Sequence, residues 1–526
     1  MPTYYVDYAN GNDTTGDGSS LTPWKTIGKF FTSGANNDTC KVRGSSAAPH
    51  YEASISTVKT GLTIEADTGH TPEIRGSTGY ATWAATGGTT NVYQTTCTTV
   101  AAAIYSVWNG TTKLTSTANV GACDALTNSF FIDDPGDLLH VNIGGSAPTQ
   151  IEVVSTWSPN FLIMGAGATV RNLNFKYFGK AALSCTTANW TISGCTFSLW
   201  GPPFSVGCIS ISSTGATISS CTFTITGTEY PFAWAAGAGT ATITGCTITN
   251  PSGLRVTVGT GHIISNTTVA GVTGGGVIPS IYISGTATAC TITGCTTTSG
   301  AYGIKIDAGT DHVVTNCTCS NVTGDGIQFL TGVTATVSYC TTYDTYHAGF
   351  YATGAGCAIT YHHCLAYSTH DIGQGYGWVC HTTAAITCYH CIAAFASRCT
   401  GIIRAGFYVL DAGSSLTLRN CIAYSNLTGI QAEAGTTYDV DYCLCNGNTN
   451  DYSGLSPGAH DVTGDPLFVS TVAYSEDFHL RSGSPCINTG VALVGFNDGF
   501  VGAAPDIGMY ETAALVTSAI SRLRRR

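Results

Sequence analysis

The sequence predicts an all-β fold, a right-handed parallel β-helix (solenoid), on three observations: a repeating phrase, strand-like alternation and repeat lengths that vary. The phrase reads Ile192-Ser-Gly-Cys195-Thr-Phe197, then Ile218-Ser-Ser-Cys221-Thr-Phe223, then Ile243-Thr-Gly-Cys246-Thr-Ile248. The units are rich in Thr, Ile, Val and Ser and carry no helical i, i+3, i+4 stripe. Neighbouring copies lie 20 to 30 residues apart, which fits coils of three short strands joined by turns of unequal size.

One position in each unit, called here the cysteine slot, sets the register of the repeat. The slot is read at Leu173, Cys195, Cys221, Cys246, Asn266, Cys295, Cys317, Cys340, Cys364, Cys391, Cys421 and Cys443. Parallel coils stack about 4.8 Å apart, so one slot per coil becomes a column of side chains. A free thiol is a small hydrophobe that suits such a column, whereas a disulfide needs Cβ atoms about 3.8 Å apart. We therefore predict a ladder of buried, reduced thiols. No metal site is expected, since no C-x-x-C pair has a partner pair at zinc-finger spacing.

Composition narrows the functional classes. The 526 residues include 20 Lys and Arg against 31 Asp and Glu, a net charge of -11, so there is no basic footprint for nucleic acid. A surface of hydroxyls and amides suits contact with carbohydrate or protein. The 23 cysteines are an odd number, which argues against a secreted disulfide framework. We expect no cofactor.

The start of the chain bears on localisation. Met1 to Val6 shows neither the cationic nor the apolar region of a signal peptide, and no apolar run approaches the length of a membrane span. We expect synthesis in a reducing host cytoplasm and a place in a virion, which the protein would reach without a signal peptide. An extracellular location is the alternative.

The chain divides into five predicted segments. They are an N-terminal cap with the first coils (1–80), an inserted small β module (81–160), the parallel β-helix with the cysteine ladder (161–450), closing coils (451–512) and a basic tail (513–526). A short amphipathic helix is expected over Trp24 to Phe31, covering the open end of the first coil. In the module, Asp133-Asp-Pro-Gly-Asp137 is read as a turn before it is read as a calcium site.

Motifs at both ends carry a family resemblance. Near the start stand Tyr5-Val-Asp7, Asn10-Gly-Asn-Asp13, Gly16-Asp-Gly18 and Pro23-Trp-Lys-Thr-Ile27. Near the end stand Gly464-Asp-Pro-Leu-Phe468, Asp477-Phe-His-Leu480 and Pro505-Asp-Ile-Gly-Met-Tyr-Glu511. With the repeat, they resemble right-handed β-helix proteins of the pectate-lyase-like superfamily, the kind found in phage virion proteins and polysaccharide-active enzymes. The resemblance implies the fold over nearly the whole chain. It leaves activity open, because such end motifs occur on enzymes and non-enzymes alike.

A second column is expected on the outside of the solenoid. In strands such as Gly303-Ile-Lys305-Ile and Gly349-Phe-Tyr351, the residue after Gly should point inward and the next outward. The outward residues would be Lys305, Asp307, Gln328, Tyr351, Tyr408, Asp411 and Gln431. Among them Lys305, Asp307, Gln328, Tyr351 and Tyr408 are the candidates for carbohydrate binding, with the tyrosines stacking on sugar rings.

The turn that enters this face carries the catalytic candidates Asp325, His347, Asp371 (after His370) and Arg404, about one coil apart. Lyases and hydrolases of the fold that the chain resembles use acids and a base spread over adjacent coils. Two carboxylates and a His could act as general acid and base in glycoside cleavage. Polar turn residues line up on any solenoid, however, so catalysis, sugar binding without turnover and a purely structural role all stay open. The calcium-binding acids and the essential arginine of pectate lyases have no clear counterpart.

Two functions follow. The first is a virion-associated structural or adhesion protein of a bacteriophage, such as a capsid decoration, spike or fibre component. The second is a polysaccharide lyase or glycoside hydrolase acting on the flat parallel face. The lack of a secretion signal, the reduced thiols and the basic tail favour the first, and the acids, His and Tyr favour the second. Expected partners are other virion or assembly proteins, bound through the tail arginines, and a polysaccharide. A homo-oligomer is compatible with the sequence, and nucleic acid is not expected to bind.

Overall fold

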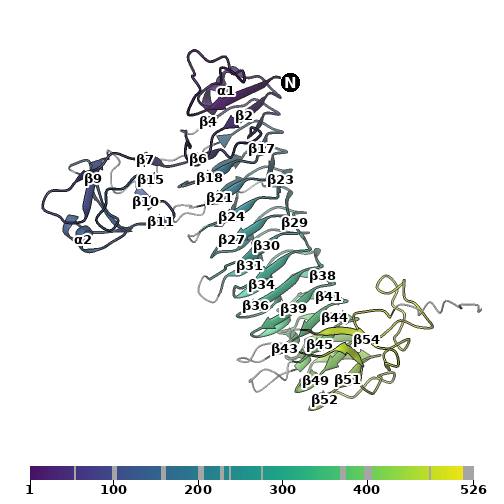
Figure 1. Ribbon diagram of the computed structural model, residues 1–526. Helices are drawn as coiled ribbons and strands as arrows, with labels where there is room; N and C mark the ends of the chain where they lie inside the picture. Colours follow the sequence, from purple (N-terminus) through teal and green to yellow (C-terminus); the bar gives the residue numbers. More distant parts are fainter. Residues whose placement is uncertain are drawn as a thin grey trace, which may run out of the picture. The chain divides into compact units, whose positions relative to one another are not determined.

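The computed structural model describes residues 1–52, 55–97, 104–134, 136–155, 162–198, 207–225, 230–235, 238–273, 277–367, 375–395, 405–472 and 475–512. The predictions for His370, Asp371 and Arg404 and for the basic tail 513–526 concern residues outside these ranges. Two compact units are distinguished, residues 1–300 and residues 301–526, and each is described by itself. In both, parallel strands stack coil upon coil (Figure 1). The predicted all-β solenoid is thereby confirmed.

In the first unit, successive coils place strands in a first, a second and a third sheet. The first sheet holds β1 (Thr3–Asp7), β2 (Thr39–Arg43), β5 (Thr63–Ala66), β17 (Thr169–Arg171), β20 (Thr191–Ser193), β23 (Ala216–Ser219), β26 (Ala241–Thr244), β29 (Ile263–Ser265) and β32 (Thr291–Thr293). The second sheet holds β3 (His50–Tyr51), β6 (Glu73–Arg75), β18 (Asn174–Lys176), β21 (Thr196–Ser198), β24 (Thr222–Thr224), β27 (Thr247–Thr249), β30 (Thr268–Ala270) and β33 (Thr296–Thr298). The third face is formed by β4 (Ile55–Ser56), β16 (Leu162–Ile163), β19 (Leu183–Cys185), β22 (Ile209–Ile211) and β25 (Phe232–Trp234), and by the pair β28 (Leu254–Val256) and β31 (Pro279–Ile283).

A single left-handed residue makes the bend between the first and second sheets. It is Asn172 (φ 57°), Gly194 (φ 62°) and Gly245 (φ 59°) in three of the coils. Glycine and asparagine tolerate this conformation best, because most side chains clash with the backbone there. The residue after the bend fills the cysteine slot. The repeat phrase Ser-Gly-Cys-Thr is therefore a strand end, a bend, a buried thiol and the next strand.

This geometry corrects the residue assigned to the cysteine slot in one coil. Asn266 was predicted to fill it, but Asn266 is the left-handed bend residue (φ 47°), and Thr267 is the fully buried residue of the slot. The Thr267 hydroxyl donates to the carbonyl of Ser265 at 3.0 Å, as the Cys246 thiol donates to the carbonyl of Thr244 at 3.5 Å. In this coil the hydroxyl of Thr267 replaces the thiol and donates to the carbonyl two residues earlier, as the thiol does in other coils. The position of the cysteine slot therefore cannot be assigned from residue type alone.

The interior is filled by like side chains stacked in register. Phe175, Phe197 and Phe223 pair across β18, β21 and β24, and their rings are stacked with centroids 5.1 and 4.8 Å apart. All three side chains are fully buried. Burial of each aromatic ring stabilises the fold by about 2–3 kcal/mol relative to exposure.

The first coil is covered by helix α1 (Ile27–Ser33), which begins three residues later than predicted. The Thr26 hydroxyl caps it by accepting from the amide of Lys29 at 3.1 Å, which fixes the start. The Glu52 carboxylate also accepts from the amides of Ile27 and Gly28. Ile27, Phe30 and Phe31 are the buried residues of the helix.

A small module of mostly antiparallel strands interrupts the coils of the first unit. It consists of β7 (Thr78–Tyr80), β8 (Ala84–Ala85), β9 (Val92–Thr96), β10 (Ile104–Asn109), β11 (Thr112–Lys113), β12 (Thr115–Ser116), α2 (Val120–Ala125), β13 (Ser129–Asp133), β14 (Leu138–Asn142) and β15 (Ile151–Ser155). Its core includes Val107, Leu139, Val141 and Ile151. Its strands lie within the predicted range 81–160 except for β7, which pairs with β15.

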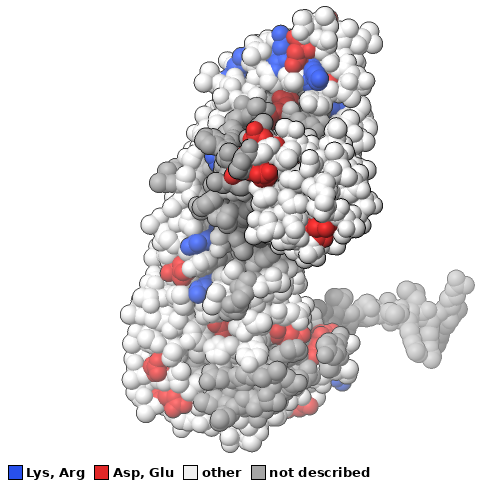
Figure 2. Space-filling model, turned by 90° about the vertical axis from the view of Figure 1, so that its left-hand side faces the viewer, with Lys and Arg blue, Asp and Glu red and all other residues white. Residues whose placement is uncertain are grey.

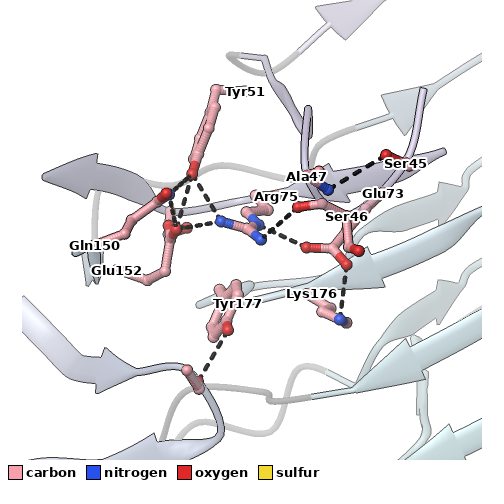
Figure 3. Close-up of polar contacts among 12 residues, drawn as sticks. Ser45, Ser46, Ala47, Tyr51, Glu73, Arg75, Gln150, Glu152, Lys176 and Tyr177 are labelled. Atoms are coloured by element: carbon pink, nitrogen blue, oxygen red, sulfur yellow. Dashed lines mark hydrogen bonds and ion pairs between the residues drawn. The ribbon is translucent and has the colours of Figure 1, made fainter. Parts of the chain in front are cut away.

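A network of charges joins this module to the coils (Figure 3). The Arg75 guanidinium donates from Nε to Glu73 at 2.6 Å and from Nη1 to Tyr51 Oη at 2.9 Å and to Glu152 at 2.5 Å. Lys176 pairs with the second oxygen of Glu73 at 2.7 Å. Glu73 and Glu152 are each 2% exposed, so removing Arg75 would leave two buried carboxylates with one cation. The cluster fixes how the module meets the second sheet.

In the second unit the same three sheets are formed. The first sheet holds β35 (His312–Thr315), β38 (Thr334–Ser338), β41 (Ala358–His362), β44 (Ala385–Tyr389), β47 (Ser415–Arg419) and β50 (Thr437–Asp441). The second sheet holds β36 (Thr318–Val322), β39 (Thr341–Thr345), β42 (Leu365–Tyr367), β45 (Ile392–Ala394), β48 (Ile422–Tyr424) and β51 (Leu444–Asn446). The third sheet holds β34 (Tyr302–Ile306), β37 (Ile327–Phe329), β40 (Ala348–Thr353), β43 (Tyr376–His381), β46 (Ala405–Val409), β49 (Thr428–Ala432) and β52 (Asn450–Ser453).

The closing segment packs against the second sheet of this unit. It contains the hairpin β53 (Phe468–Ser470) and β54 (Asp477–Leu480). Phe468, Phe478, Cys486 and Ile507 form one buried cluster with apolar residues of β42, β45, β48 and β51. The segment thus covers apolar side chains on the outside of the second sheet.

The described cysteines are all buried and none is in a disulfide. In one coil the Cys221 thiol donates to the carbonyl of Ser219 at 3.3 Å. Burial raises the pKa of Cys340 well above its usual value, so the thiol stays protonated. That the slot thiols act as one continuous ladder stays a prediction.

The described residues carry neither a membrane-spanning helix nor a cluster of metal ligands. They contain no helix long and apolar enough to cross a membrane. They also contain no group of three or more His, Cys, Asp or Glu side chains placed to hold a metal ion.

Candidate functional site

The third sheet of the second unit carries inward and outward columns in strict alternation. Inward lie Ile304, Ile327, Phe350, Trp378, Phe407 and Ile430, each at most 1% exposed. Outward, register pairing aligns Lys305, Gln328, Tyr351, Val379, Tyr408 and Gln431. A glycine near the start of each strand is required because the backbone of the next coil lies too close for a side chain. A Cβ on Gly326 would lie 2.6 Å from the carbonyl oxygen of Gly349 in the next coil.

An aspartate and a histidine from adjacent coils form the centre of the candidate site. Asp325 Oδ1 lies 2.6 Å from His347 Nδ1, and Asp325 Oδ2 accepts from Gln328 Nε2 at 2.8 Å. Asp325 is 1% exposed, whereas the His347 side chain is 31% exposed. A buried carboxylate at Nδ1 fixes the orientation of the imidazole ring and occupies that nitrogen. Proton exchange between His347 and a ligand would therefore run through Nε2.

A tyrosine links this pair to a second histidine and aspartate. The Tyr351 ring lies 5.3 Å from the His347 ring, and its hydroxyl is 2.6 Å from His381 Nδ1. His381 Nε2 is 2.9 Å from Asp411 Oδ2. Burial, and then the charge of Asp325, raise the pKa of Tyr351 to about 12, so the phenol keeps its proton at neutral pH. Asp325, His347, Tyr351, His381 and Asp411 thus form a polar row across four coils.

The accessible part of the face extends one coil earlier. The Lys305 ammonium lies 4.8 Å from the centre of the Tyr302 ring, a cation–π contact. Tyr302, Lys305 and Asp307 are partly exposed. On the side of the molecule that Figure 2 shows, charged side chains are sparse and scattered among uncharged residues. A ligand at this face would meet tyrosine and imidazole rings together with the charged groups of Lys305, Asp307 and Asp411.

Two predicted carbohydrate-binding residues are not available to a ligand in this structure. Gln328 is 7% exposed and Tyr408 is 1% exposed, although both point outward by register. Tyr408 is stacked on Tyr376 with ring centroids 5.3 Å apart, and its hydroxyl donates to Glu433 at 2.9 Å. Tyr376, Val379 and Tyr408 form an apolar cluster on the outside of the sheet. The inward and outward alternation along the strand places both residues at the surface. Packing against other side chains buries them nevertheless.

The structure brings together only part of the predicted catalytic set. Asp325 and His347 are in contact, whereas Asp371 and Arg404 lie outside the described residues. His381 was missed. The outward alternation would have found it, because Val379 pairs with Tyr351 and His381 pairs with Thr353 two residues on.

The comparisons with known proteins agree with this architecture. Residues 232–393 match the family model described as "Right handed beta helix region". No curated protein matches the sequence.

Solved structures that resemble the chain share little sequence with it. Pectate lyase Pel9A is 12% identical with a TM-score of 0.34, over 98% of this chain and 97% of that one. The Dettilon tailspike protein (gp208) is 12% identical with a TM-score of 0.40, over 55% of this chain and 62% of that one. A PL6 alginate lyase solved with a trisaccharide is 10% identical with a TM-score of 0.30, over 58% and 81%. Similarity at this level says nothing of activity. The stacked coils give the chain the fold of a parallel β-solenoid, and the family model that residues 232–393 match describes a right-handed β-helix.

Proposed function

We propose that the third sheet of the second unit binds a polysaccharide, and that the protein serves in adhesion as a capsid decoration, spike or fibre component of a bacteriophage. The observation that carries the binding proposal is the group of accessible rings and polar side chains on one flat, rigid sheet. Tyr302, Lys305, His347, Tyr351 and His381 come from adjacent coils and are all partly exposed.

This combination matches what a sugar chain presents. The CH faces of a pyranose ring pack on aromatic rings, and its hydroxyls exchange hydrogen bonds with side chains already held in place. Tyr351 is oriented by His381, and His347 by Asp325, so little side-chain freedom would be lost on binding. Parallel coils about 4.8 Å apart offer repeated contacts to a repeating polymer.

The virion setting is supported by the sequence. Few charges, reduced thiols and the basic segment 513–526 suit a protein made in the cytoplasm and built into a particle. This part of the proposal is tested separately, by detecting the chain in purified phage particles by mass spectrometry. Its absence from particles would refute the virion assignment and leave the binding proposal intact.

Cleavage of the bound polymer is a second candidate function, favoured by the 2.6 Å contact between Asp325 and His347. In a β-elimination on a uronic-acid polymer, His347 would take the proton next to the sugar carboxylate. The bond from carbon to the glycosidic oxygen would break, a carbon–carbon double bond would form, and Tyr351 would protonate the leaving oxygen. Lys305 is a partly exposed cation of this face that could neutralise the sugar carboxylate.

Hydrolysis fits the described geometry less well. A two-carboxylate mechanism needs one carboxylic acid free to protonate the glycosidic oxygen. Both oxygens of Asp325 are already engaged, by His347 and Gln328, and the residue is buried. Asp325 is therefore not the acid of such a mechanism, and its contact with His347 favours elimination.

The test of binding is affinity electrophoresis through gels that contain neutral or uronic-acid polysaccharides. Tyr351→Ala should weaken retention about tenfold, the worth of one ring contact. Tyr438→Ala is the matched control, because Tyr438 is an exposed tyrosine on β50 of the first sheet. Equal retention of the wild type and Tyr351→Ala on every gel would refute the binding face.

Cleavage is tested on the same polymers by the ultraviolet absorbance of unsaturated products. His347→Gln should abolish product formation while retention in the gel persists. If the wild type releases no unsaturated product from any polymer that it binds, the elimination candidate is wrong and binding without turnover remains.

A further inference from the structure

An open cavity of about 320 Å³ lies in the second unit, away from the third sheet. One wall comes from the bends between the first and second sheets, at Tyr339, His363 and His390. The other wall comes from the closing segment and includes Phe496, Asp498, Phe500 and Glu511. The cavity is not part of the proposed polysaccharide face, and its use does not depend on that function.

The bend wall is a stack of three rings in unusual backbone positions. Tyr339, His363 and His390 have φ values of 52°, 52° and 55°, at a bend where most other coils of the chain use Asn or Gly. Their rings are stacked, with centroids 4.9 and 4.8 Å apart. A bulky residue in this conformation costs about 1 kcal/mol or more, and such strain is typical of functional positions.

The ring stack is uncharged at neutral pH. Burial lowers the pKa of His363 to about 3 and that of His390 to about 4. His390 Nδ1 donates to the carbonyl of Gly508, and Nε2 accepts from Asn497 at 2.8 Å. Tyr339, at the end of the stack, is 47% exposed. The wall therefore offers a π surface that does not repel a cation.

The opposite wall presents two carboxylates held in place by the backbone. Asp498 accepts from the amide of Gly495, and Glu511 accepts from the amides of Val501 and Asp506 at 3.0 Å. Both residues keep exposed surface, and no Lys or Arg is among the described residues that line the cavity. A planar cation can stack on the rings of one wall and pair with the carboxylates of the other. A guanidinium stacks on aromatic rings and pairs with carboxylates, which an ammonium does less well.

We propose that this cavity is an arginine-binding pocket and that its occupant is an arginine of the same chain's basic segment 513–526. The segment begins two residues after Glu511, which is itself part of the pocket wall, and it carries Arg522, Arg524, Arg525 and Arg526. Arg522 lies 11 residues beyond Glu511, a reach of up to about 36 Å, ample for the chain to turn back. So short a connection gives an effective concentration on the order of millimolar, which favours binding within the chain.

The test compares two full-length proteins in their binding of a fluorescent synthetic peptide of residues 514–526. In one protein the four arginines are replaced by Gln; the other is the wild type. The Gln protein should bind the peptide, and the wild type should bind it at least about tenfold more weakly, because its own segment competes. A peptide with Lys at the four positions should bind more weakly than the Arg peptide, and added salt should weaken both.

Two variants in the Gln protein locate the peptide. Tyr339→Asn keeps a residue that tolerates the bend and removes the ring, and it should weaken binding about tenfold. Tyr442→Asn is the matched control, since Tyr442 is a bend residue (φ 55°) stacked on His460 and not part of the cavity wall. No binding by the Gln protein, or equal losses in the two variants, would overturn the pocket. Peptide binding by the wild type as tight as by the Gln protein would overturn occupancy by the same chain. A wild type that also self-associates with concentration would assign the pocket to a second copy.

Discussion

In the third sheet of the second unit, adjacent residues along a strand differ in burial and in chemical type. The inward column runs Ile304, Ile327, Phe350, Trp378 and Phe407, all apolar and fully buried. The outward column runs Lys305, Gln328, Tyr351, Val379 and Tyr408, with no common chemistry. One-residue steps along a strand exchange the two faces, so packing constrains every second residue. The outward residues are left for ligands, and this is where a candidate site is found.

Some residues outside the coils are nevertheless buried. Tyr408 and His390 lie outside the coils yet are 1% and 2% exposed. Tyr408 is covered by neighbours on its own sheet, and His390 by the closing segment. A position outside the coil is therefore only a candidate for the surface, and distant parts of the chain decide whether it stays there.

The largest expected effect comes from placing a charge in the inward cysteine slot. Cys340 is fully buried, so Cys340→Asp should lower the free energy of unfolding by at least about 5 kcal/mol, because its carboxylate has no partner there. Cys340→Ser should cost about 1–2 kcal/mol and Cys340→Ala less. Urea unfolding of the three variants measures the order. Equal midpoints would mean that the slot faces solvent.

A smaller effect separates the two columns directly. Phe350 is fully buried, and its ring is stacked on that of Trp378 with centroids 4.6 Å apart. Phe350→Ala should lower the free energy of unfolding by about 3–4 kcal/mol, through lost burial and a cavity. Tyr351→Ala, one residue away, should cost at most about 1.5 kcal/mol, because it removes one hydrogen bond from a partly exposed residue. Similar losses in thermal or urea unfolding would contradict the division into columns.

The fold was predictable because the sequence repeats. Each coil has the same order of strand, bend and buried residue. The phrase around Cys195, Cys221 and Cys246 therefore indicates the register of the coils several times independently. Errors arose where one coil departs from the pattern. The Asn266 slot was one residue out because Thr267 replaces the thiol, and the N-terminal helix starts later because Thr26 caps it.

The candidate site was predictable only where it depends on neighbouring coils. Asp325 and His347 were paired correctly, since they lie 22 residues apart and parallel stacking brings such positions together. The burial of Tyr408 and the cavity beside His390 depend on contacts across the chain. Gly508, for example, meets His390 across 118 residues, and no local pattern encodes that contact.

The smallest expected effect tests a residue outside the coils that the closing segment has buried. Burial lowers the pKa of His390 from 6.5 to about 4 in the folded protein. Between these values the unfolded chain binds a proton that the folded protein excludes, so stability falls as the pH drops from about 6.5 towards 4. The contribution is fully present above pH 6.5 and amounts to about 3 kcal/mol at most.

His390→Asn keeps a residue that tolerates the bend and removes the titrating group. The variant should be less stable than the wild type at neutral pH, because the hydrogen bonds to Gly508 and Asn497 are lost. Its stability should nevertheless fall less steeply between pH 6.5 and 4, as measured by urea unfolding at several pH values. A His390→Asn slope equal to that of the wild type would show that His390 is open to solvent in the native protein. The closing segment would then not cover the outside of the coil as described.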